Sequence, residues 1–259
     1  LWSDYDKTVY YNTYDVTEQL RRGENVVGIL LGNGFYNVQG GRYRKLQISF
    51  GPPTLLFELV INYEDGTCTT VHSDNNWKYD SSPVTFNCIY GGEDYDARRE
   101  QKGWNQIGFD DSHWRPVVVQ EAPKGVLRPQ MAAPVKIMER CDIQKVTKLN
   151  AEQIASASIS TKRTVDPSAF VLDMGQNLAG FPEITVRGKR GQKVTLIVAE
   201  ALTDEGACNQ RQTGRQHYYE YTLKGEGDET WHPRFSYYGF RYIQVEGAVL
   251  KGQKNPQKL

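Results

Sequence analysis

Short segments of alternating or wholly apolar residues recur along this chain, and most of them end in a turn rich in glycine, aspartate or asparagine. Residues 54–63 form one such segment, residues 64–66 read Glu-Asp-Gly, and residues 67–73 return in a similar pattern. Two strand-like segments on either side of a short glycine-containing turn predict a β-hairpin. Residues 26–31 are a continuous apolar run, which predicts a buried central strand.

The second half of the chain repeats this pattern. Residues 183–187 and 193–198 alternate polar and apolar side chains around a turn at 188–191, and they predict a second hairpin. Residues 219–223 carry Tyr, Tyr and Leu at alternate positions, so these side chains share one face of a strand. Residues 242–246 predict a last strand that ends at a glycine.

Helical patterns are scarce. Asp15 and Glu18 fit a capping box and Gly23 fits a stop, so residues 16–22 predict one short helix. The 16 tyrosines and 24 glycines favour sheet and turns. Many short strands with regular turns and little helix predict an all-β chain folded as two β-sandwiches in tandem.

A weakly patterned stretch at residues 121–167 separates the two halves, and we expect the domain boundary near residues 160–168. The predicted organisation is a first sandwich over residues 1–165 and a second over residues 166–248. Residues 249–259 have no apolar period and predict a tail or linker.

The composition argues against several kinds of partner. The formal net charge is zero, so a long-range field that attracts nucleic acid or an anionic membrane is not expected. No apolar stretch is long enough to span a bilayer. The 4 cysteines form no CxxC pair and the 4 histidines share no metal-ligand spacing, so no metal site is predicted from them. We expect buried thiols, with disulfides as the alternative, and a periplasmic, extracellular or cytoplasmic location fits equally.

The densest group of candidate binding residues lies between positions 90 and 98. It consists of Tyr90, Glu93, Asp94, Tyr95, Asp96 and Arg98. Proteins hold sugars by stacking apolar sugar faces on aromatic rings and by pairing hydroxyls with carboxylates and arginine. The oxygen-rich sequence would also suit Ca²⁺, although its spacing is not that of an EF-hand. The alternative is a structural pair between Asp96 and Arg98.

A second candidate contact lies in the Gly-Asn-Gly-Phe-Tyr sequence at residues 32–36. Asn33 and Tyr36 would contact a sugar from a loop at the end of a strand. The alternative is a glycine turn with positive φ whose aromatic ring packs in the core.

The Phe-Asp-Asp-Ser-His-Trp sequence at residues 109–114 predicts a turn capped by its own polar side chains. Trp114 and Trp104 are then expected to be buried between sheets. We expect no catalytic role for the carboxylates of this turn.

Three blocks together resemble a known family. Residues 173–181 read Asp-Met-Gly-Gln-Asn-Leu-Ala-Gly-Phe, residues 231–242 read Trp-His-Pro-Arg-Phe-Ser-Tyr-Tyr-Gly-Phe-Arg-Tyr, and residues 92–98 read Gly-Glu-Asp-Tyr-Asp-Ala-Arg. They are similar to the β-sandwiches that precede the catalytic barrel in bacterial α-L-rhamnosidases of glycoside hydrolase family 78. Phe35 stands where this family usually has tryptophan.

The resemblance implies a galactose-binding-like, jelly-roll first domain and a second sandwich that docks on an (α/α)6 catalytic barrel. It implies that the parent protein hydrolyses terminal α-L-rhamnose by inversion and takes a rhamnose-containing glycan or glycoside as its substrate. This chain lacks the sustained helical period of such a barrel. We therefore expect a non-catalytic, supporting part of the enzyme, with no catalytic residue of its own.

Two other functions stay open. The chain would act as a carbohydrate-binding module if it holds a sugar, with or without Ca²⁺. It would be a purely structural scaffold between domains if it holds none, and an exposed apolar patch on the second sandwich would favour that function.

Overall fold

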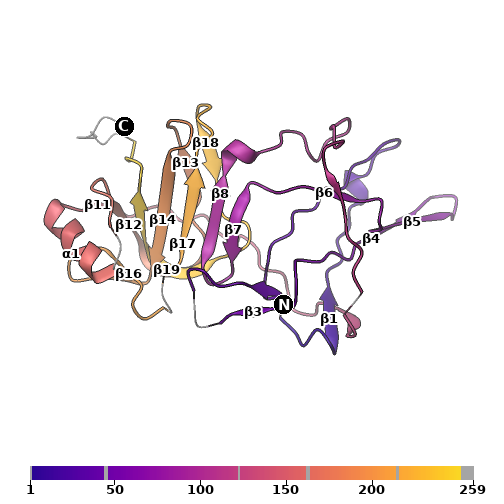
Figure 1. Cartoon of the computed structure of the whole chain (residues 1–259), viewed down its shortest axis with the longest axis horizontal. Coiled ribbons are helices and arrows are strands. Elements are labelled where there is room, and N and C mark those ends of the chain that lie inside the picture. The colour runs from indigo at the N-terminus through magenta and orange to yellow at the C-terminus, as the bar shows by residue number, and fades with distance from the viewer. Residues whose placement is uncertain (1, 44–45, 122, 162–163, 214–215, 252–259) are drawn as a thin grey trace.

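The computed structural model describes residues 2–43, 46–121, 123–161, 164–213 and 216–251. Its ribbon divides into a compact β-sheet region and a more open region of short strand pairs (Figure 1). The all-β, sandwich-like fold class predicted from the sequence is confirmed.

A seven-stranded sheet forms the centre of the compact region. In spatial order its strands are β11 (Lys145–Lys148), β12 (Phe170–Gly180), β19 (Tyr238–Glu246), β14 (Lys193–Ala199), β17 (Tyr218–Thr222), β8 (Gly92–Asp96) and β7 (Val84–Cys88). Every neighbouring pair is antiparallel except β17 and β8, which are parallel.

This sheet combines strands from both halves of the sequence. The hairpin of β7 and β8 belongs to the predicted first domain, residues 1–165, yet β8 pairs with β17 and places Glu93 opposite Tyr219. Figure 1 shows these two magenta strands completing the orange and yellow sheet. The predicted tail at 249–259 lies outside the described residues from residue 252 onward.

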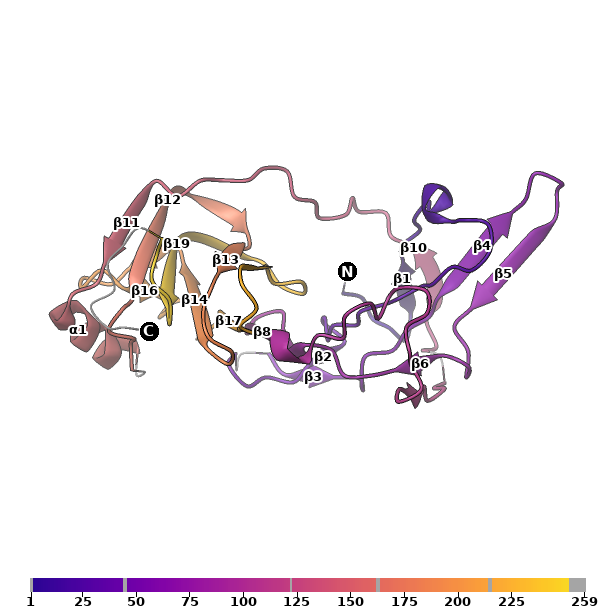
Figure 2. The ribbon, with the colours of Figure 1, turned by 90° about the horizontal axis from the view of Figure 1, so that it is seen from above.

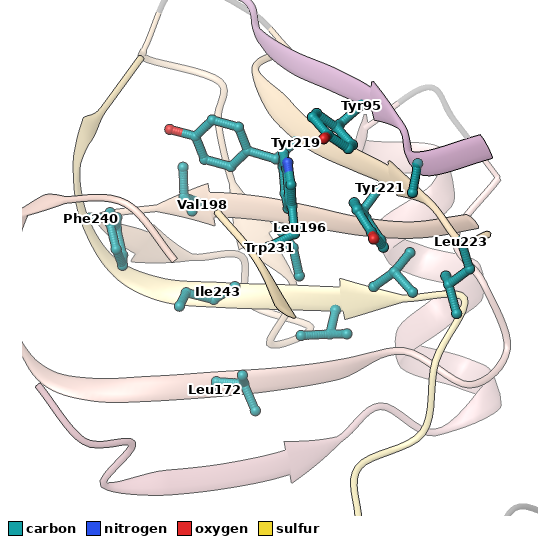
Figure 3. Close-up of a cluster of buried hydrophobic side chains, with 13 residues drawn as sticks. Tyr95, Leu172, Leu196, Val198, Tyr219, Tyr221, Leu223, Trp231, Phe240 and Ile243 are labelled. Carbon is teal, nitrogen blue, oxygen red and sulfur yellow. The ribbon is translucent and has the colours of Figure 1, made fainter. Parts of the chain in front are cut away.

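The main core lies on one face of this sheet (Figure 3). Tyr219 and Tyr221 are buried at alternate positions of β17, and Leu223 follows them just beyond its end, so the face predicted from their spacing is confirmed. The Tyr95 ring of β8 stacks on Tyr221 with the centroids 5.7 Å apart. The aromatic contact therefore joins β8 to β17 on the core side as well as through the backbone.

A smaller sheet of β13 (Ile184–Val186) and β18 (Glu229–Trp231) contributes to this core. The predicted hairpin of residues 183–187 with 193–198 is therefore wrong, because β13 pairs with β18 while β14 pairs with β17 and β19. The turn between them bonds to the end of β17, where Gly191 N donates to Leu223 O at 2.8 Å. It thus carries the chain from one sheet to the other.

Glu229 fixes the turn that leads into β18. Its Oε1 accepts hydrogen bonds from Gly225 N at 2.8 Å and Glu226 N at 3.4 Å. Its Oε2 accepts from Tyr221 Oη at 2.8 Å and Lys224 N at 3.0 Å. Burial raises the pKa of this carboxyl, but the four hydrogen bonds outweigh burial and hold the pKa below its ordinary value.

The first half consists largely of two-stranded pairs joined by irregular chain (Figure 2). The pairs are β1 (Thr8–Tyr11) with β10 (Val126–Pro129), β2 (Asn37–Val38) with β3 (Ile48–Ser49), β4 (Glu58–Asn62) with β5 (Cys68–His72), and β6 (Lys78–Tyr79) with β9 (Arg115–Pro116). The predicted hairpin over residues 54–73 is confirmed as β4 and β5. Gly66 adopts a φ of 82° in its turn.

The predicted strand at residues 26–31 is wrong. This segment makes no strand pairing within the described residues, and Val26, Val27 and Leu31 are each exposed by about 45%. A continuous apolar run indicates a buried strand only when other elements cover both of its faces. Here Gly28 packs against the Trp104 ring, and most of the segment remains open.

The predicted helix at residues 16–22 is shorter than expected. One 3-10 turn, η1 (Thr17–Gln19), follows Asp15, whose Oδ1 accepts a hydrogen bond from Thr17 N at 3.0 Å. A helix that was not predicted, α1 (Ala151–Thr161), lies between β11 and β12. Asn150 and Gln153 form its reciprocal capping box, with both side-chain to backbone hydrogen bonds at 2.9 Å.

The chain between β10 and β11 is extended and crosses from the open region to the sheet (Figure 2). The ion pair between Arg140 Nη1 and Glu183 Oε1, at 2.6 Å, ties this segment to the start of β13. The Arg140 side chain is 73% exposed and that of Glu183 is 36% exposed. No helix in the described ranges is long and apolar enough to cross a bilayer.

All four cysteines are free. Cys88 and Cys208 are buried, as expected from the sequence, whereas Cys68 and Cys141 are exposed. Burial raises the pKa of the Cys208 thiol to about 12.

Candidate functional site

Glu93 lies fully buried in β8, directed toward the loop that precedes β19. Its Oε2 accepts hydrogen bonds from Arg234 N and Phe235 N, each at 3.0 Å. Its Oε1 makes no hydrogen bond within the described part of the chain. Burial raises the pKa of Glu93, and the two backbone donors oppose that rise. This residue therefore anchors a loop of the second half to a strand of the first.

Asp94 and Arg42 of the first half form an ion pair that also contacts Tyr218 of the second half, and we call this cluster the Arg42 clamp. It consists of Arg42, Asp94, Phe86 and Tyr218. Arg42 donates to both carboxylate oxygens of Asp94 and, through Nη1, to Tyr218 O at 3.1 Å. Its guanidinium carbon lies 3.5 Å from the Tyr218 ring centroid and 4.5 Å from that of Phe86. Burial raises the pKa of Asp94 against the opposing effect of Arg42.

The end of this predicted site is also held by internal contacts. The hydroxyl of the buried Tyr95 donates a hydrogen bond to Glu100 Oε1 at 3.0 Å. Asp96 caps the 3-10 turn η2 (Ala97–Arg99) and accepts from Arg98 Nε at 2.8 Å and Nη2 at 2.7 Å. The Arg98 side chain holds the pKa of Asp96 below its ordinary value. The structural pair that was the alternative to sugar contact is thus present.

Asn33 attaches the turn at residues 32–36 to the end of β7. Its backbone N donates to Asn87 Oδ1 at 2.7 Å and its Nδ2 donates to Asn87 O at 2.9 Å. Its Oδ1 accepts from Asn37 Nδ2 at 3.0 Å. The polar groups of Asn33 are therefore used within the protein.

Tyr36 and Tyr90 belong to two neighbouring aromatic groups. Tyr36 contacts the rings of Tyr5 and Phe50, with centroid distances of 5.2 Å and 5.6 Å. Tyr90 stacks on Tyr43 at 4.6 Å, and its ring also meets Phe35 edge to face at 5.9 Å. The structure thus brings Asn33, Tyr36 and Tyr90 into one region, while Glu93 to Arg98 follow β8 away from it. Sugar binding by these eight residues stays a prediction.

A concavity beside these rings was not predicted from the sequence. It has a volume of about 430 Å³ and is lined by Trp2, Ser3, Asp4, Tyr5, Asp6 and Phe50. We call it the Trp2 pocket. The first six residues alternate aromatic and acidic side chains in part, which is the sequence pattern that could have indicated it.

The described carboxylates are dispersed. Within the described ranges, no group of three or more histidine, cysteine, aspartate or glutamate side chains is placed to hold a metal ion. Of the three acids considered for Ca²⁺, Asp94 and Asp96 are each paired with an arginine, and Glu93 accepts hydrogen bonds from backbone N–H groups.

The blocks that carried the family resemblance have structural roles. Asp173 Oδ1 accepts from Gly175 N at 2.7 Å across a bulge in β12, and its carboxylate also binds Arg241 with two hydrogen bonds. These contacts hold the bulge of β12 and attach it to β19.

The turn at residues 109–114 is capped as predicted, because Asp110 Oδ1 accepts from Ser112 N at 3.0 Å. Trp104 and Trp114 are only half-buried and lie among loops, so their expected burial between sheets is wrong. Trp114 Nε1 instead donates to Gln101 Oε1 at 2.8 Å.

Each half of the chain matches a known protein family. Residues 1–139 match the family described as the α-L-rhamnosidase N-terminal domain, and residues 163–259 match the bacterial α-L-rhamnosidase concanavalin-like domain. α-L-Rhamnosidases from Formosa agariphila and Streptomyces avermitilis are each 36% identical to this chain. The matches cover 96% and 95% of this chain but 26% and 22% of those proteins.

Solved structures agree with these matches. An α-L-rhamnosidase from Dictyoglumus thermophilum superposes with a TM-score of 0.81 at 33% identity, over 98% of this chain and 26% of its own. The S. avermitilis α-L-rhamnosidase, solved in complex with L-rhamnose, gives a TM-score of 0.75 at 33% identity, over 98% and 23%. This chain spans about a quarter of the length of these relatives. It belongs to the α-L-rhamnosidase family, of which it carries the N-terminal domain and the concanavalin-like domain.

Proposed function

We propose that this chain is the non-catalytic N-terminal part of an α-L-rhamnosidase-like glycoside hydrolase. It supports the hydrolysis of terminal α-L-rhamnose, from a rhamnose-containing glycan or glycoside, by a catalytic barrel elsewhere in the parent protein. The observation that carries this proposal is the match of the two halves to the N-terminal and concanavalin-like domains of α-L-rhamnosidases, over about a quarter of the relatives' length.

The state of the carboxylates supports a non-catalytic role. An inverting glycosidase uses two carboxyl groups about 6.5–9.5 Å apart, one as general acid and one as general base. Arg98 holds the pKa of Asp96 below its ordinary value, which favours the ionised form and opposes the role of a general acid. Both oxygens of the Asp94 carboxylate accept hydrogen bonds from Arg42, so they are used within the protein. Glu93 is fully buried and binds backbone N–H groups, so it does not face a substrate. We assign the inverting chemistry to the barrel.

The shared sheet supports a supporting role. Because β8 pairs with both β7 and β17, the β7 and β8 hairpin of the first half is built into the same sheet as the strands of the second half. A unit of this kind can hold a neighbouring domain in a fixed orientation, which is what a substrate cleft between domains requires.

An assay with an aryl α-L-rhamnoside tests the proposal. The purified chain is expected to release no aryl alcohol above the uncatalysed rate, whereas the parent protein hydrolyses the same compound. The parent reaction, followed by NMR, should first release β-L-rhamnose because inversion changes the anomeric configuration. Turnover by the isolated chain would refute the non-catalytic assignment, and release of the α-anomer would refute inversion.

A carbohydrate-binding module is the second candidate function, and the Trp2 pocket favours it. Exposed aromatic rings beside carboxylates are the surface that sugars require. A pure scaffold receives less support, because Tyr237 is the one exposed large apolar side chain among the described residues of the second sandwich. The apolar patch expected for docking is therefore not found there.

A further inference from the structure

We propose that the core beneath the shared sheet binds one internal water molecule, held by Glu93 Oε1, Ser236 Oγ and Tyr238 Oη. Glu93 belongs to β8 of the first half, whereas Ser236 and Tyr238 belong to the second half, at the start of β19. The water therefore connects the two halves inside the protein. This site does not depend on the proposed function, because it involves only buried groups of the fold.

Unpartnered polar atoms identify the site. Within the described residues, four buried side-chain nitrogen and oxygen atoms make no hydrogen bond: Glu93 Oε1, Trp231 Nε1, Ser236 Oγ and Tyr238 Oη. Leaving such an atom without a partner is costly, so folded proteins satisfy buried polar groups with protein atoms or with internal water. Three of the four atoms belong to residues that interact with one hydroxyl, that of Tyr219.

Tyr219 is fully buried on β17, and its hydroxyl is only weakly bonded. Its Oη donates to Ser236 O at 3.4 Å, compared with about 2.7–2.8 Å for a typical O–H···O hydrogen bond. Figure 3 shows this hydroxyl directed away from the rings of Tyr95 and Tyr221. It therefore faces the loop before β19 and has room for a better partner than the Ser236 carbonyl.

The groups around this hydroxyl influence one another without direct hydrogen bonds. Burial raises the pKa of Tyr219, and the neighbouring Tyr238 and Glu93 add to the rise. Burial also raises the pKa of Tyr238, and the Ser236 hydroxyl opposes that rise. The centroids of the Tyr219 and Tyr238 rings lie 5.6 Å apart. Polar groups that are close but not directly bonded are those that a bridging water joins.

The charges around the site favour a neutral ligand. The Glu93 carboxyl disfavours an anion, and positive charge on Arg42 and Arg234 nearby disfavours a cation. A water molecule can both donate and accept hydrogen bonds, so it suits either protonation state of Glu93. An internal water typically makes about three hydrogen bonds, which matches the three unpartnered atoms.

The sign of a stability change tests the site. If Tyr238 Oη binds the water, Tyr238→Phe removes a hydrogen bond that is in use, and the folding equilibrium constant from urea unfolding should fall by about fivefold. If this hydroxyl has no partner, the same substitution removes a buried unsatisfied group and should stabilise the protein. Ser236→Ala should give a loss of similar size. A gain in stability in either variant would overturn the proposal.

The double variant Ser236→Ala/Tyr238→Phe tests whether both hydroxyls bind the same molecule. Its fold-change should be clearly smaller than the product of the two single fold-changes, because the second substitution removes an interaction already lost. Fold-changes that multiply would rule out a shared water. Tyr237→Phe is the matched control, because this side chain is 52% exposed and the loss of its hydroxyl should leave the equilibrium constant unchanged.

A crystal structure of the intact chain identifies the ligand. It should show one density peak about 2.5–3.0 Å from Glu93 Oε1, Ser236 Oγ and Tyr238 Oη. A direct hydrogen bond between the two hydroxyls, with no peak, would overturn the water site. Melting temperatures in NaCl, KCl and choline chloride at equal ionic strength should agree. A higher melting temperature in one of the alkali salts would assign the peak to that cation instead.

Discussion

The Arg42 guanidinium lies 3.5 Å from the centroid of the Tyr218 ring, although the two residues are separated by 176 positions in the sequence. The Arg42 side chain is only 13% exposed, and its charge is balanced by Asp94 on the adjacent strand. A loop of the first half is thus attached to β8 and β17, two inner strands of the sheet, by an ion pair, a ring contact and a backbone hydrogen bond together.

Removing the Arg42 clamp should destabilise the protein strongly. Arg42→Ala leaves the largely buried Asp94 carboxylate without its partner, and we expect a loss of roughly 3 kcal/mol in the free energy of unfolding. Urea unfolding measures this loss. Arg140→Ala is the matched control, because it breaks an exposed ion pair and should cost less than about 1 kcal/mol. Equal losses in the two variants would contradict the role of the clamp.

Gly92 should tolerate no side chain. It adopts a φ of 96°, and a Cβ atom there would overlap the carbonyl oxygen of Tyr218 on the paired strand. Gly92→Ala is expected to cost more than about 3 kcal/mol in unfolding free energy, because β8 and β17 must separate. Gly66→Ala controls for the backbone conformation, since its φ is 82° and nothing lies within 4 Å of its Cβ position. It should cost only about 1 kcal/mol.

Glu93 should make stability fall as the pH rises. Its pKa is raised above the ordinary value of 4.5, so the folded protein keeps this proton at pH values where the unfolded chain has lost it. The unfolding free energy should therefore decrease as the pH increases from 4.5 toward the folded pKa. Glu93→Gln keeps an acceptor oxygen for the backbone donors but does not titrate, so it should lack this decrease.

The test compares wild type and Glu93→Gln by urea unfolding between about pH 4 and pH 8. The pKa of Asp94 is also raised, but Asp94 is present in both proteins. Its effect on the pH dependence of the unfolding free energy therefore cancels when the two proteins are subtracted. A difference that does not vary with pH would contradict burial as the dominant influence on Glu93.

Glu229 should show the opposite dependence. Four hydrogen bonds hold its pKa below the ordinary value of 4.5, so its contribution is complete above pH 4.5 and is lost as the pH falls through the folded pKa. Glu229→Gln should cost about 2 kcal/mol at neutral pH, because an amide nitrogen then faces backbone donors. The deficit should shrink on acidification, and urea unfolding at decreasing pH will measure it. A deficit that grows in acid would reverse the assignment.

Local patterns in the sequence predicted the local elements. The alternation at residues 219–223 gave the buried face of β17, and the Glu-Asp-Gly turn gave the β4 and β5 hairpin, because both depend on neighbouring residues. The pairing of β14 was not predictable in the same way. A turn at residues 188–191 does not reveal whether the chain returns to the same sheet or moves to another.

In the candidate site, too, the sequence indicated single residues but not the distant residues that they contact. The sequence identified Glu93, Asp94 and Asp96 as chemically notable, but it could not supply their partners. Arg42 comes from a distant loop, and the Arg234 and Phe235 N–H groups carry no side-chain pattern at all. The capping box of α1, with Asn150 and Gln153, was readable and was overlooked because the surrounding stretch lacks a strong apolar period.

The position of β8 inside the sheet has a consequence for how such proteins can be divided and inherited. If the chain were cut after residue 165, β8 in the first fragment would lose its partner β17. In the second fragment, the unpaired backbone N–H and C=O groups of β17 would be open to pairing with a strand of another molecule. The two halves that match separate family descriptions therefore share one sheet, and recombination that exchanged either half alone would have to replace a strand inside that sheet.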